Sequence, residues 1–136
     1  MWLGGIRFPD VDGLAGHSDG DAVCHALADA LLGAAALGDV GAHFPDTDPA
    51  IAGIGGVELL RQTMELVRRA GHDLMSCDVT VICERPAVAP RRDEIRAVLA
   101  DALGLGQACV SVKATRPEGL GLVGDGAGCL ALAVLA

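Results

Sequence analysis

The stretch Gly16–Val40, with the sequence GHSDGDAVCHALADALLGAAALGDV, decides the fold. Its centre is almost entirely Ala and Leu, which predicts one buried helix. Ser18 or Asp19 is expected to cap this helix, which should run to Leu37 and stop at Gly38. Acidic, loop-like clusters stand at both ends. We therefore expect a rigid helix that carries polar groups at each end.

The rest of the sequence alternates between strand-like and helix-like segments in no regular order. Because there is no βαβ repeat, we predict a single α+β domain over residues 1–136, with a mixed β-sheet and helices packed on one face. The expected elements are a strand or hairpin at 2–8 with Gly4 and Gly5 at its turn, an acidic loop at 41–56, helices at 57–70 and 90–103, strands at 77–83, 109–115 and 129–135, and a glycine-rich loop at 119–128.

The charge of the chain restricts its partners. The net charge is -8, and the only aromatic residues are Trp2, Phe8 and Phe44. A negative protein repels nucleic acid and anionic membranes, and so few aromatic rings offer little for bases to stack on. We expect no nucleic-acid and no membrane partner. A phosphorylated ligand would need a metal ion as counter-charge.

The five cysteines contain no C-x-x-C pair; they are Cys24, Cys77, Cys83, Cys109 and Cys129. Each lies in an apolar or strand-like context, so we expect buried, reduced thiols. No run reaches the ~20 apolar residues that span a bilayer, and the N-terminus does not resemble a signal peptide. These features predict a cytoplasmic protein.

Residues 129–135 are apolar on both faces of the expected C-terminal strand. Helices of the same domain can cover one face, and a symmetric homo-oligomer is the simplest cover for the other. The alternative is that these Leu and Ala side chains fill the core of their own domain.

His25 is the first candidate metal ligand. Asp21 lies one helical turn before it and Asp29 one turn after, so the three share a helix face. A carboxylate on one ring nitrogen leaves the other nitrogen free for a metal, whereas a surface ion pair is the alternative. A zinc site needs three protein ligands, and no H-x-H, D-x-H or C-x-x-C motif completes one here.

Two further segments suit phosphate. His17 and Ser18 precede a helix N-terminus, where free backbone N–H groups attract anions. Residues 113–118, KATRPE, follow a strand and carry Lys, Thr and Glu, which suit a contact between phosphate and metal. A plain helix cap and a solvated turn are the alternatives. His43 and His72 lie in loop or turn contexts and receive no role.

The glycine-rich loop contains GLGLVG at residues 119–124, which matches the G-x-G-x-x-G pattern of dinucleotide-binding folds. The residues that follow, DGAG, cannot open a helix, so the structural context of that pattern is missing. We expect a bent strand connection, or a close approach of the backbone to a ligand or a neighbouring subunit.

Together these segments resemble the 2-C-methyl-D-erythritol 2,4-cyclodiphosphate synthase family. The matching stretches are GLAGHSDGDAVCHALADALLGAAALGDVGAHFPDTDP, DVTVICERP, and VSVKAT with EGLGL. The resemblance implies a homotrimer with active sites at subunit interfaces. It also implies that 4-diphosphocytidyl-2-C-methyl-D-erythritol 2-phosphate is cyclised with release of CMP, in non-mevalonate isoprenoid biosynthesis. The 2-phosphate is then the nucleophile, and Zn2+ (or another divalent transition metal) with Mg2+ or Mn2+ neutralises charge.

The resemblance assigns roles by position. His25 matches the zinc-binding histidine of the helix, and Glu118 matches the ligand of the second metal. His17, Thr115 and Glu118 match the catalytic positions, and His17 is placed to stabilise the transition state. The substrate-binding positions are His17 and Ser18 for phosphate, Asp39, Val40, Gly41, Phe44, Pro45, Asp46, Thr47 and Asp48 for the methylerythritol part, Cys83, Pro86, Ala87, Val88 and Ala89 for cytosine, Thr115, Arg116 and Glu118 for the nucleotide phosphates, and Leu122 as a further contact.

Several positions depart from the family. The family opens with a strand that carries Asp-x-His, two more zinc ligands, and Met1 aligns inside the next strand. Ala87 replaces a lysine, Arg116 a threonine, Asp125 an arginine and Ala127 an acidic residue. We therefore expect weak zinc binding, poor turnover and no binding of isoprenoid diphosphates along the trimer axis.

Two explanations fit these departures: a family member shortened at its N-terminus, or a diverged trimeric paralogue that binds a cytidine nucleotide without turnover. We favour the first, because a sheet that lacks its first strand would expose an edge and part of the core. An Asp-x-His strand encoded in frame upstream would decide between them.

Overall fold

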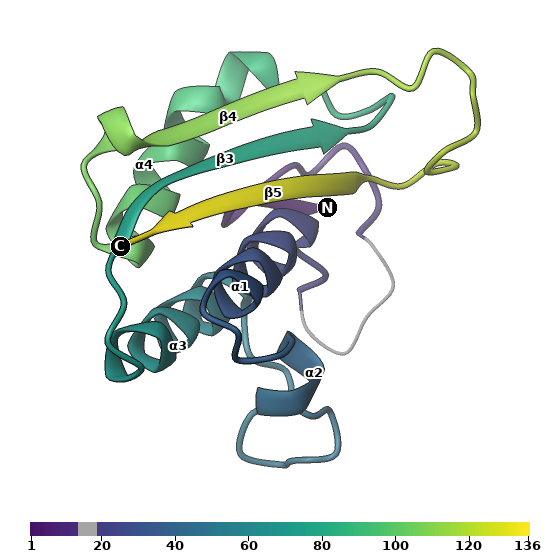
Figure 1. Cartoon of the computed structure of the whole chain (residues 1–136). Coiled ribbons are helices and arrows are strands. Elements are labelled where there is room, and N and C mark those ends of the chain that lie inside the picture. The colour runs from purple at the N-terminus through teal and green to yellow at the C-terminus, as the bar shows by residue number, and fades with distance from the viewer. Residues whose placement is uncertain (14–18) are drawn as a thin grey trace.

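A three-stranded sheet forms one layer of the molecule (Figure 1). The structure is a computed structural model that describes residues 1–13 and 19–136. Strand β3 (Leu74–Ile82) is central and pairs in parallel with β4 (Val110–Thr115) and antiparallel with β5 (Gly128–Leu135). The mixed sheet confirms the predicted α+β class.

The helices cover one face of this sheet, and α1 and α3 pack on each other beneath it. Aliphatic side chains fill the space between the layers, among them Leu27, Leu31, Leu60 and Leu99, which are fully buried. The helical elements are α1 (Ala22–Ala34), α2 (Val40–His43), α3 (Gly56–Arg69), the 3-10 turn η1 (Ala89–Arg91), α4 (Arg92–Leu103) and the 3-10 turn η2 (Gln107–Cys109).

A small hairpin precedes this arrangement, made of β1 (Trp2–Leu3) and β2 (Ile6–Arg7). Its turn is Gly4-Gly5, as predicted, and both glycines have positive φ, 60° and 77°. A Cβ atom on Gly4 would also collide with the side chain of Ile95 on α4. The turn therefore requires glycine both for its conformation and for its close approach to the helix.

Helix α1 begins later than predicted. Asp21 is its N-cap and accepts hydrogen bonds from the backbone N–H groups of Val23 and Cys24, both at 3.0 Å. The prediction of Asp19 as the cap is therefore wrong, and Ser18 lies outside the described residues. The physical reason is that the Asp21 carboxylate already satisfies the free amides of the first turn.

The same helix also ends earlier, at Ala34 rather than Leu37. Ala36 adopts a left-handed conformation, with φ 56°, and the Leu37 N–H donates back to the Leu32 carbonyl at 2.8 Å. This is the Schellman arrangement, usually made with glycine. Here an alanine makes it two residues before Gly38, the glycine expected to stop the helix.

Three other boundaries differ from prediction. The acidic segment expected as loop begins with the short helix α2, because the Asp39 side chain caps it by accepting from the Ala42 N–H. The helix expected from Pro90 starts at Arg92, after the 3-10 turn that contains the proline. Strand β3 begins at Leu74 rather than at residue 77, because it pairs with the end of β5.

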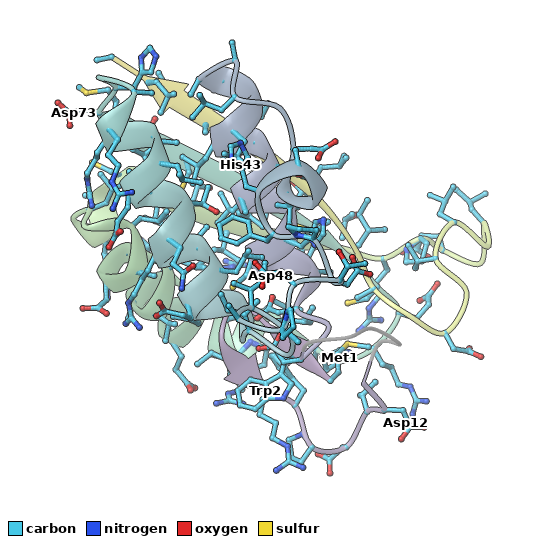
Figure 2. All side chains as sticks on the ribbon, turned by 90° about the horizontal axis from the view of Figure 1, so that it is seen from below. Met1, Trp2, Asp12, His43, Asp48 and Asp73 are labelled. Carbon is cyan, nitrogen blue, oxygen red and sulfur yellow. The ribbon has the colours of Figure 1, made fainter. Side chains whose placement is uncertain are left out.

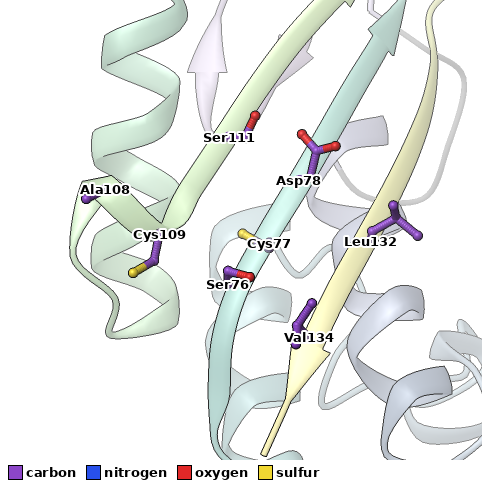
Figure 3. Close-up of a pocket in the computed structure, with 8 residues that line it drawn as sticks. All are labelled: Ser76, Cys77, Asp78, Ala108, Cys109, Ser111, Leu132 and Val134. Atoms are coloured by element: carbon purple, nitrogen blue, oxygen red, sulfur yellow. The ribbon is translucent and has the colours of Figure 1, made fainter.

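One face of β5 is covered by the helices and the other is open, so the apolar side chains on the open face do not fill the core of their own domain. Figure 3 views this open face, with the helices behind the strands. Leu130, Leu132 and Val134 are 67%, 69% and 56% exposed, and Met75 on β3 is 55% exposed. We call these four residues the open sheet face. Such a group of apolar side chains is unusual on an unpartnered surface.

The prediction of five buried thiols is correct for three of them: Cys24, Cys77 and Cys83 are buried. Cys109 is exposed, because it ends the turn η2 instead of starting a strand, and Cys129 is partly exposed. All five are free thiols, and burial raises the pKa of Cys77 to about 11 and that of Cys129 to about 12. No helix in the described part of the chain is long and apolar enough to cross a membrane.

Candidate functional site

Most of the predicted site residues form two separate groups, and Leu122 lies apart from both in the glycine-rich loop, 67% exposed. The strand-end group comprises residues 83–89 and 115–118, which follow β3 and β4. The helix group comprises His25 on α1 and residues 39–48, which contain α2. Figure 1 shows α2 well away from the ends of β3 and β4, so one subunit does not bring residues 39–48 to the strand-end group. His17 and Ser18 lie outside the described residues.

The parallel pairing of β3 and β4 creates the strand-end group. Ile82 and Thr115 are paired at the last position of the ladder, so both strands release their loops at the same edge. The Cys83 N–H donates to the Thr115 carbonyl at 3.2 Å, and the Gly119 N–H donates to Glu84 Oε1 at 3.1 Å. The two loops are thus fastened side by side, and Glu84 is a residue that sequence reasoning missed.

The strand-end group has a buried base and an exposed polar rim. Cys83 and Val88 are buried, Pro86 follows a cis peptide bond and is half-buried, and Ala87 and Ala89 are exposed. On the other loop Thr115, Arg116 and Glu118 are all exposed. This surface presents backbone groups and small side chains from one loop and charged groups from the other.

Glu118 is held in an unusual backbone conformation, with φ 52°. Non-glycine residues adopt this conformation at a cost and often do so at functional sites. Its side chain is exposed, and no other described residue forms a hydrogen bond or ion pair with its carboxylate. The carboxylate is therefore available to a cation or to a polar ligand.

Charges of both signs surround the Cys83 thiol in this group. Burial, and then the charge of Glu84, raise the pKa of the Cys83 thiol, while the nearby guanidinium of Arg116 lowers it. The effect of Arg116 on this pKa indicates that its positive charge lies close to the Cys83 thiol. The thiol itself stays protonated and is a poor nucleophile.

In the helix group, His25 projects from α1 with 61% of its side chain exposed. Its Nε2 atom lies 3.4 Å from Oδ2 of Asp29, and Oδ1 of Asp29 accepts a hydrogen bond from the Val40 N–H at 2.9 Å. One carboxylate therefore contacts both the candidate metal ligand and the start of α2. Asp29 follows His25 by one helical turn, and this spacing is the only sequence signal for the contact.

Asp21 does not act on His25, and that part of the sequence prediction is wrong. It is 3% exposed and accepts four backbone N–H groups, those of Gly4, Gly5, Val23 and Cys24, at 2.6 to 3.0 Å. The geometry of the helix cap turns this carboxylate toward the hairpin rather than along the helix.

Asp19 is also engaged with the backbone. Its Oδ1 accepts from the Asp21 N–H at 3.2 Å, and its Oδ2 accepts from the Gly56 N–H at 2.9 Å. It therefore joins the entry of α1 to the start of α3. The two acidic residues of HSDGD, Asp19 and Asp21, therefore stabilise the fold through hydrogen bonds to the backbone. The acidic loop sequence had instead suggested a cation site.

Residues 39–48 form a mostly exposed surface around α2. Val40 is buried, Phe44 is partly buried and packs against the core, and Pro45 is half-buried. Asp48 accepts from the Ala50 N–H at 2.9 Å, which shapes the turn. The remaining predicted residues of this segment, Asp39, Gly41, Asp46 and Thr47, are exposed.

His43, given no role from sequence, joins two elements. Its Nε2 lies 2.7 Å from the Leu37 carbonyl oxygen, so the ring ties the last turn of α2 to the segment after α1. Figure 2, seen from below, shows His43 and Asp48 on the α2 side of the molecule. This contact and the Asp29–Val40 hydrogen bond fix both ends of a helix only four residues long.

The described residues fit a metal only in part. An exposed imidazole with a carboxylate at one nitrogen has the donor chemistry of a metal-bound histidine. Within residues 1–13 and 19–136, however, no three His, Cys, Asp or Glu side chains are grouped to hold an ion. These residues of one subunit therefore do not provide a complete tetrahedral zinc site.

A pocket of about 300 Å³ lies on the open side of the sheet (Figure 3). Ser76, Cys77, Asp78 and Ser111 contribute to its lining, together with Leu132 and Val134. Lys113, and then Ser111, hold the pKa of Asp78 below its usual range. None of the predicted site residues that the structure describes lines this pocket, so it is separate from both groups.

Comparison with known proteins places this geometry in a family. The model of the YgbB family matches residues 1–136. The 2-C-methyl-D-erythritol 2,4-cyclodiphosphate synthase of Thioalkalivibrio sulfidiphilus is 52% identical over 132 residues, which are 97% of this chain and 82% of that protein. The bifunctional enzyme IspD/IspF of an Anaeromyxobacter species is also 52% identical over 132 residues, but the chain spans only 34% of its length.

Solved structures agree with the sequence matches. A 2C-methyl-D-erythritol-2,4-cyclodiphosphate synthase in its CDP-bound form superimposes with a TM-score of 0.93 at 36% identity, over 100% of this chain and 89% of that chain. The CDP complex of IspF from Plasmodium falciparum gives a TM-score of 0.82 at 30% identity, over 98% and 80% of the two chains. The resemblance inferred from the motifs is thereby confirmed, and the chain belongs to the YgbB family, that of the 2-C-methyl-D-erythritol 2,4-cyclodiphosphate synthases.

Proposed function

We propose that this chain cyclises 4-diphosphocytidyl-2-C-methyl-D-erythritol 2-phosphate to 2-C-methyl-D-erythritol 2,4-cyclodiphosphate and releases CMP, in non-mevalonate isoprenoid biosynthesis. The observation that carries the proposal is the likeness, over 100% of this chain, to a synthase structure in a CDP-bound form. The strand-end group supports it, because two fastened loops with exposed Thr115, Arg116 and Glu118 suit a nucleoside diphosphate.

The reaction needs no nucleophile from the protein. An oxygen of the substrate's 2-phosphate attacks the β-phosphorus and forms a new P–O bond. The bond from that phosphorus to the oxygen it shares with the CMP part breaks, and CMP leaves with this oxygen. The protonated, buried thiol of Cys83, the one cysteine in the strand-end group, agrees with such a mechanism. Catalysis then rests on positioning and charge neutralisation.

Each group has a proposed task. Residues 83–89 hold the cytosine, and Thr115, Arg116 and Glu118 hold the nucleotide phosphates. Asp39, Val40 and Gly41, with residues 44–48, hold the methylerythritol part. His17 and Ser18 bind phosphate, His17 stabilises the transition state, and Leu122 is a further contact.

Metal ions are part of the proposal. His25 would be one zinc ligand and Glu118 a ligand of Mg2+ or Mn2+, and such ions supply positive charge to the reacting phosphates. The donor chemistry of both side chains supports this: an exposed imidazole beside Asp29, and an exposed carboxylate without a partner among the described residues. The other zinc ligands are proposed to come from an Asp-x-His strand that precedes residue 1 in the family.

The active form is proposed to be a homotrimer with sites between subunits. Two observations support it. The open sheet face exposes three β5 side chains by 56% to 69%, and association would bury them. Residues 39–48, around α2, also lie far from the strand-end group in one subunit, which supports a site completed by a neighbour.

CMP release tests the proposal. It is measured for this chain and for the chain preceded by an Asp-x-His strand, each with and without a chelator, and CDP binding is measured by calorimetry. We expect the extended form to release CMP and the chelator to abolish the release. CDP binding without CMP release from either form would overturn the synthase proposal in favour of a nucleotide-binding paralogue, and loss of both would overturn both functions.

A further inference from the structure

We propose that Asp29 is a positioning residue that fixes His25 and the start of α2 relative to each other through the two oxygens of one carboxylate. Its importance for catalysis rests on the proposed function, but the coupling itself does not. The geometry that carries it is the Nε2–Oδ2 separation of 3.4 Å at His25 and the hydrogen bond of 2.9 Å from the Val40 N–H to Oδ1.

The contact at Val40 meets a need of the short helix. Val40 is the first residue of α2, so its N–H has no carbonyl partner within that helix. Asp39, the N-cap, uses its side chain for the Ala42 N–H instead. Asp29, eleven positions earlier in the sequence, therefore supplies the acceptor that the Val40 N–H requires.

The contact at His25 sets the form of the imidazole. A carboxylate can only accept, so its approach to 3.4 Å favours the neutral tautomer of His25 that carries the proton on Nε2, facing Oδ2 of Asp29. The Nδ1 lone pair is then free for an external partner, as in histidines that bind metals with a carboxylate behind them. An exposed pair at this spacing is weak by itself. Here the hydrogen bond from Val40 already orders the carboxylate, so less freedom is lost when the imidazole joins it.

The consequence is a link between two parts of the helix group. His25 is the candidate metal ligand, and Asp39 to Gly41 are the candidate methylerythritol contacts. A displacement of α2 would pull on Asp29 and so change its contact with His25. Asp29 would thus keep the metal ligand and the sugar-alcohol contacts in register.

Two variants separate the halves of this proposal. In D29N the amide oxygen still accepts from the Val40 N–H, but the NH₂ group now faces Nε2 as a donor. His25 must then accept at Nε2 and carry its proton on Nδ1, so the tautomer is reversed. In D29A both contacts are lost. The matched control is D101N, which removes the same charge from an exposed carboxylate paired with Arg61 on another helix.

The readouts are the ring ¹⁵N signals of neutral His25 and the hydrogen exchange of the Val40 amide, both by NMR on the intact protein. We expect the Nε2–H tautomer in the wild type and in D101N, and the Nδ1–H tautomer in D29N. Val40 exchange should stay near the wild-type rate in D29N and rise about tenfold in D29A. Far-UV circular dichroism confirms that each variant is folded.

An unchanged His25 tautomer in D29N, or unchanged Val40 exchange in a folded D29A, would overturn the coupling. Neither readout depends on turnover. If the wild type released no CMP, the proposed function would fall while the tautomer and exchange results would still decide this inference.

Discussion

Replacement of Asp21 by asparagine should destabilise the protein more than any comparable change at an exposed cap. The carboxylate is 3% exposed and accepts four backbone N–H groups, three at Oδ1 and that of Gly5 at Oδ2, 2.6 Å away. In D21N the amide oxygen can replace Oδ1, but the NH₂ group then faces the Gly5 N–H, donor against donor. The side chain also loses the charge that strengthens all four bonds.

The magnitude follows from these contacts. One hydrogen bond to a charged group is worth about 1.5–3 kcal/mol, so D21N should lower the free energy of unfolding by about 2–3 kcal/mol. In D21A the cap is lost, at about 1 kcal/mol, and the two hairpin amides are left unsatisfied, at about 1–3 kcal/mol each. A total of about 3–7 kcal/mol approaches or equals the whole stability of a small domain, so D21N is the variant to measure.

Urea unfolding at fixed protein concentration tests this, followed by far-UV circular dichroism and by the fluorescence of Trp2. Trp2 is the only tryptophan and lies in β1, next to the Gly4-Gly5 turn that Asp21 holds. The control is D39N, which changes an exposed cap with one amide bond and should cost less than about 0.5 kcal/mol, since Asn and Asp cap equally well. Equal losses in D21N and D39N would refute the reasoning.

Two further changes test other parts of the account. L132D places a negative charge on the open sheet face and should convert the proposed trimer to monomers, as measured by sedimentation velocity. The control R69S makes the net charge more negative by the same amount, but on α3, and should leave the trimer intact. A trimer in L132D would argue against this interface. Lys113 lowers the pKa of Asp78, so at acid pH the folded protein binds fewer protons at this group than the unfolded chain does. The ion pair therefore contributes to the free energy of unfolding. That contribution is full above about pH 4, the pKa of an unfolded Asp, and is lost as the pH falls through the lower pKa of the folded protein. D78N should flatten the acid slope of the unfolding free energy by less than about 1 kcal/mol, because the carboxylate is 35% exposed; an unchanged slope would count against the ion pair.

The elements of the fold follow from local sequence patterns, whereas the acidic residues show the limit of such reasoning. The Ala/Leu helix and the Gly4-Gly5 turn were each predictable, because periodicity and glycine act over a few residues. The task of Asp21 was not, since its partners include Gly4 and Gly5, sixteen or more residues away.

The candidate site shows the same limit. The sequence motifs identify which residues belong to the strand-end and helix groups, but they do not show that one subunit keeps the groups apart. That separation depends on the parallel pairing of β3 with β4 and on the packing of α1 beneath the sheet. The early end of α1 likewise required a left-handed Ala36, which no alanine-rich pattern predicts.

Subunit mixing tests most directly whether the site is shared. D39N impairs the helix group and E118Q impairs the strand-end group. Both changes are made in whichever form releases CMP without them, this chain or the chain preceded by an Asp-x-His strand. Each variant alone should then release little CMP. If sites lie between subunits, trimers assembled from equal amounts of both should regain about a quarter of wild-type activity, because about one interface in four pairs two intact groups. Mixtures no more active than either variant would contradict the shared site.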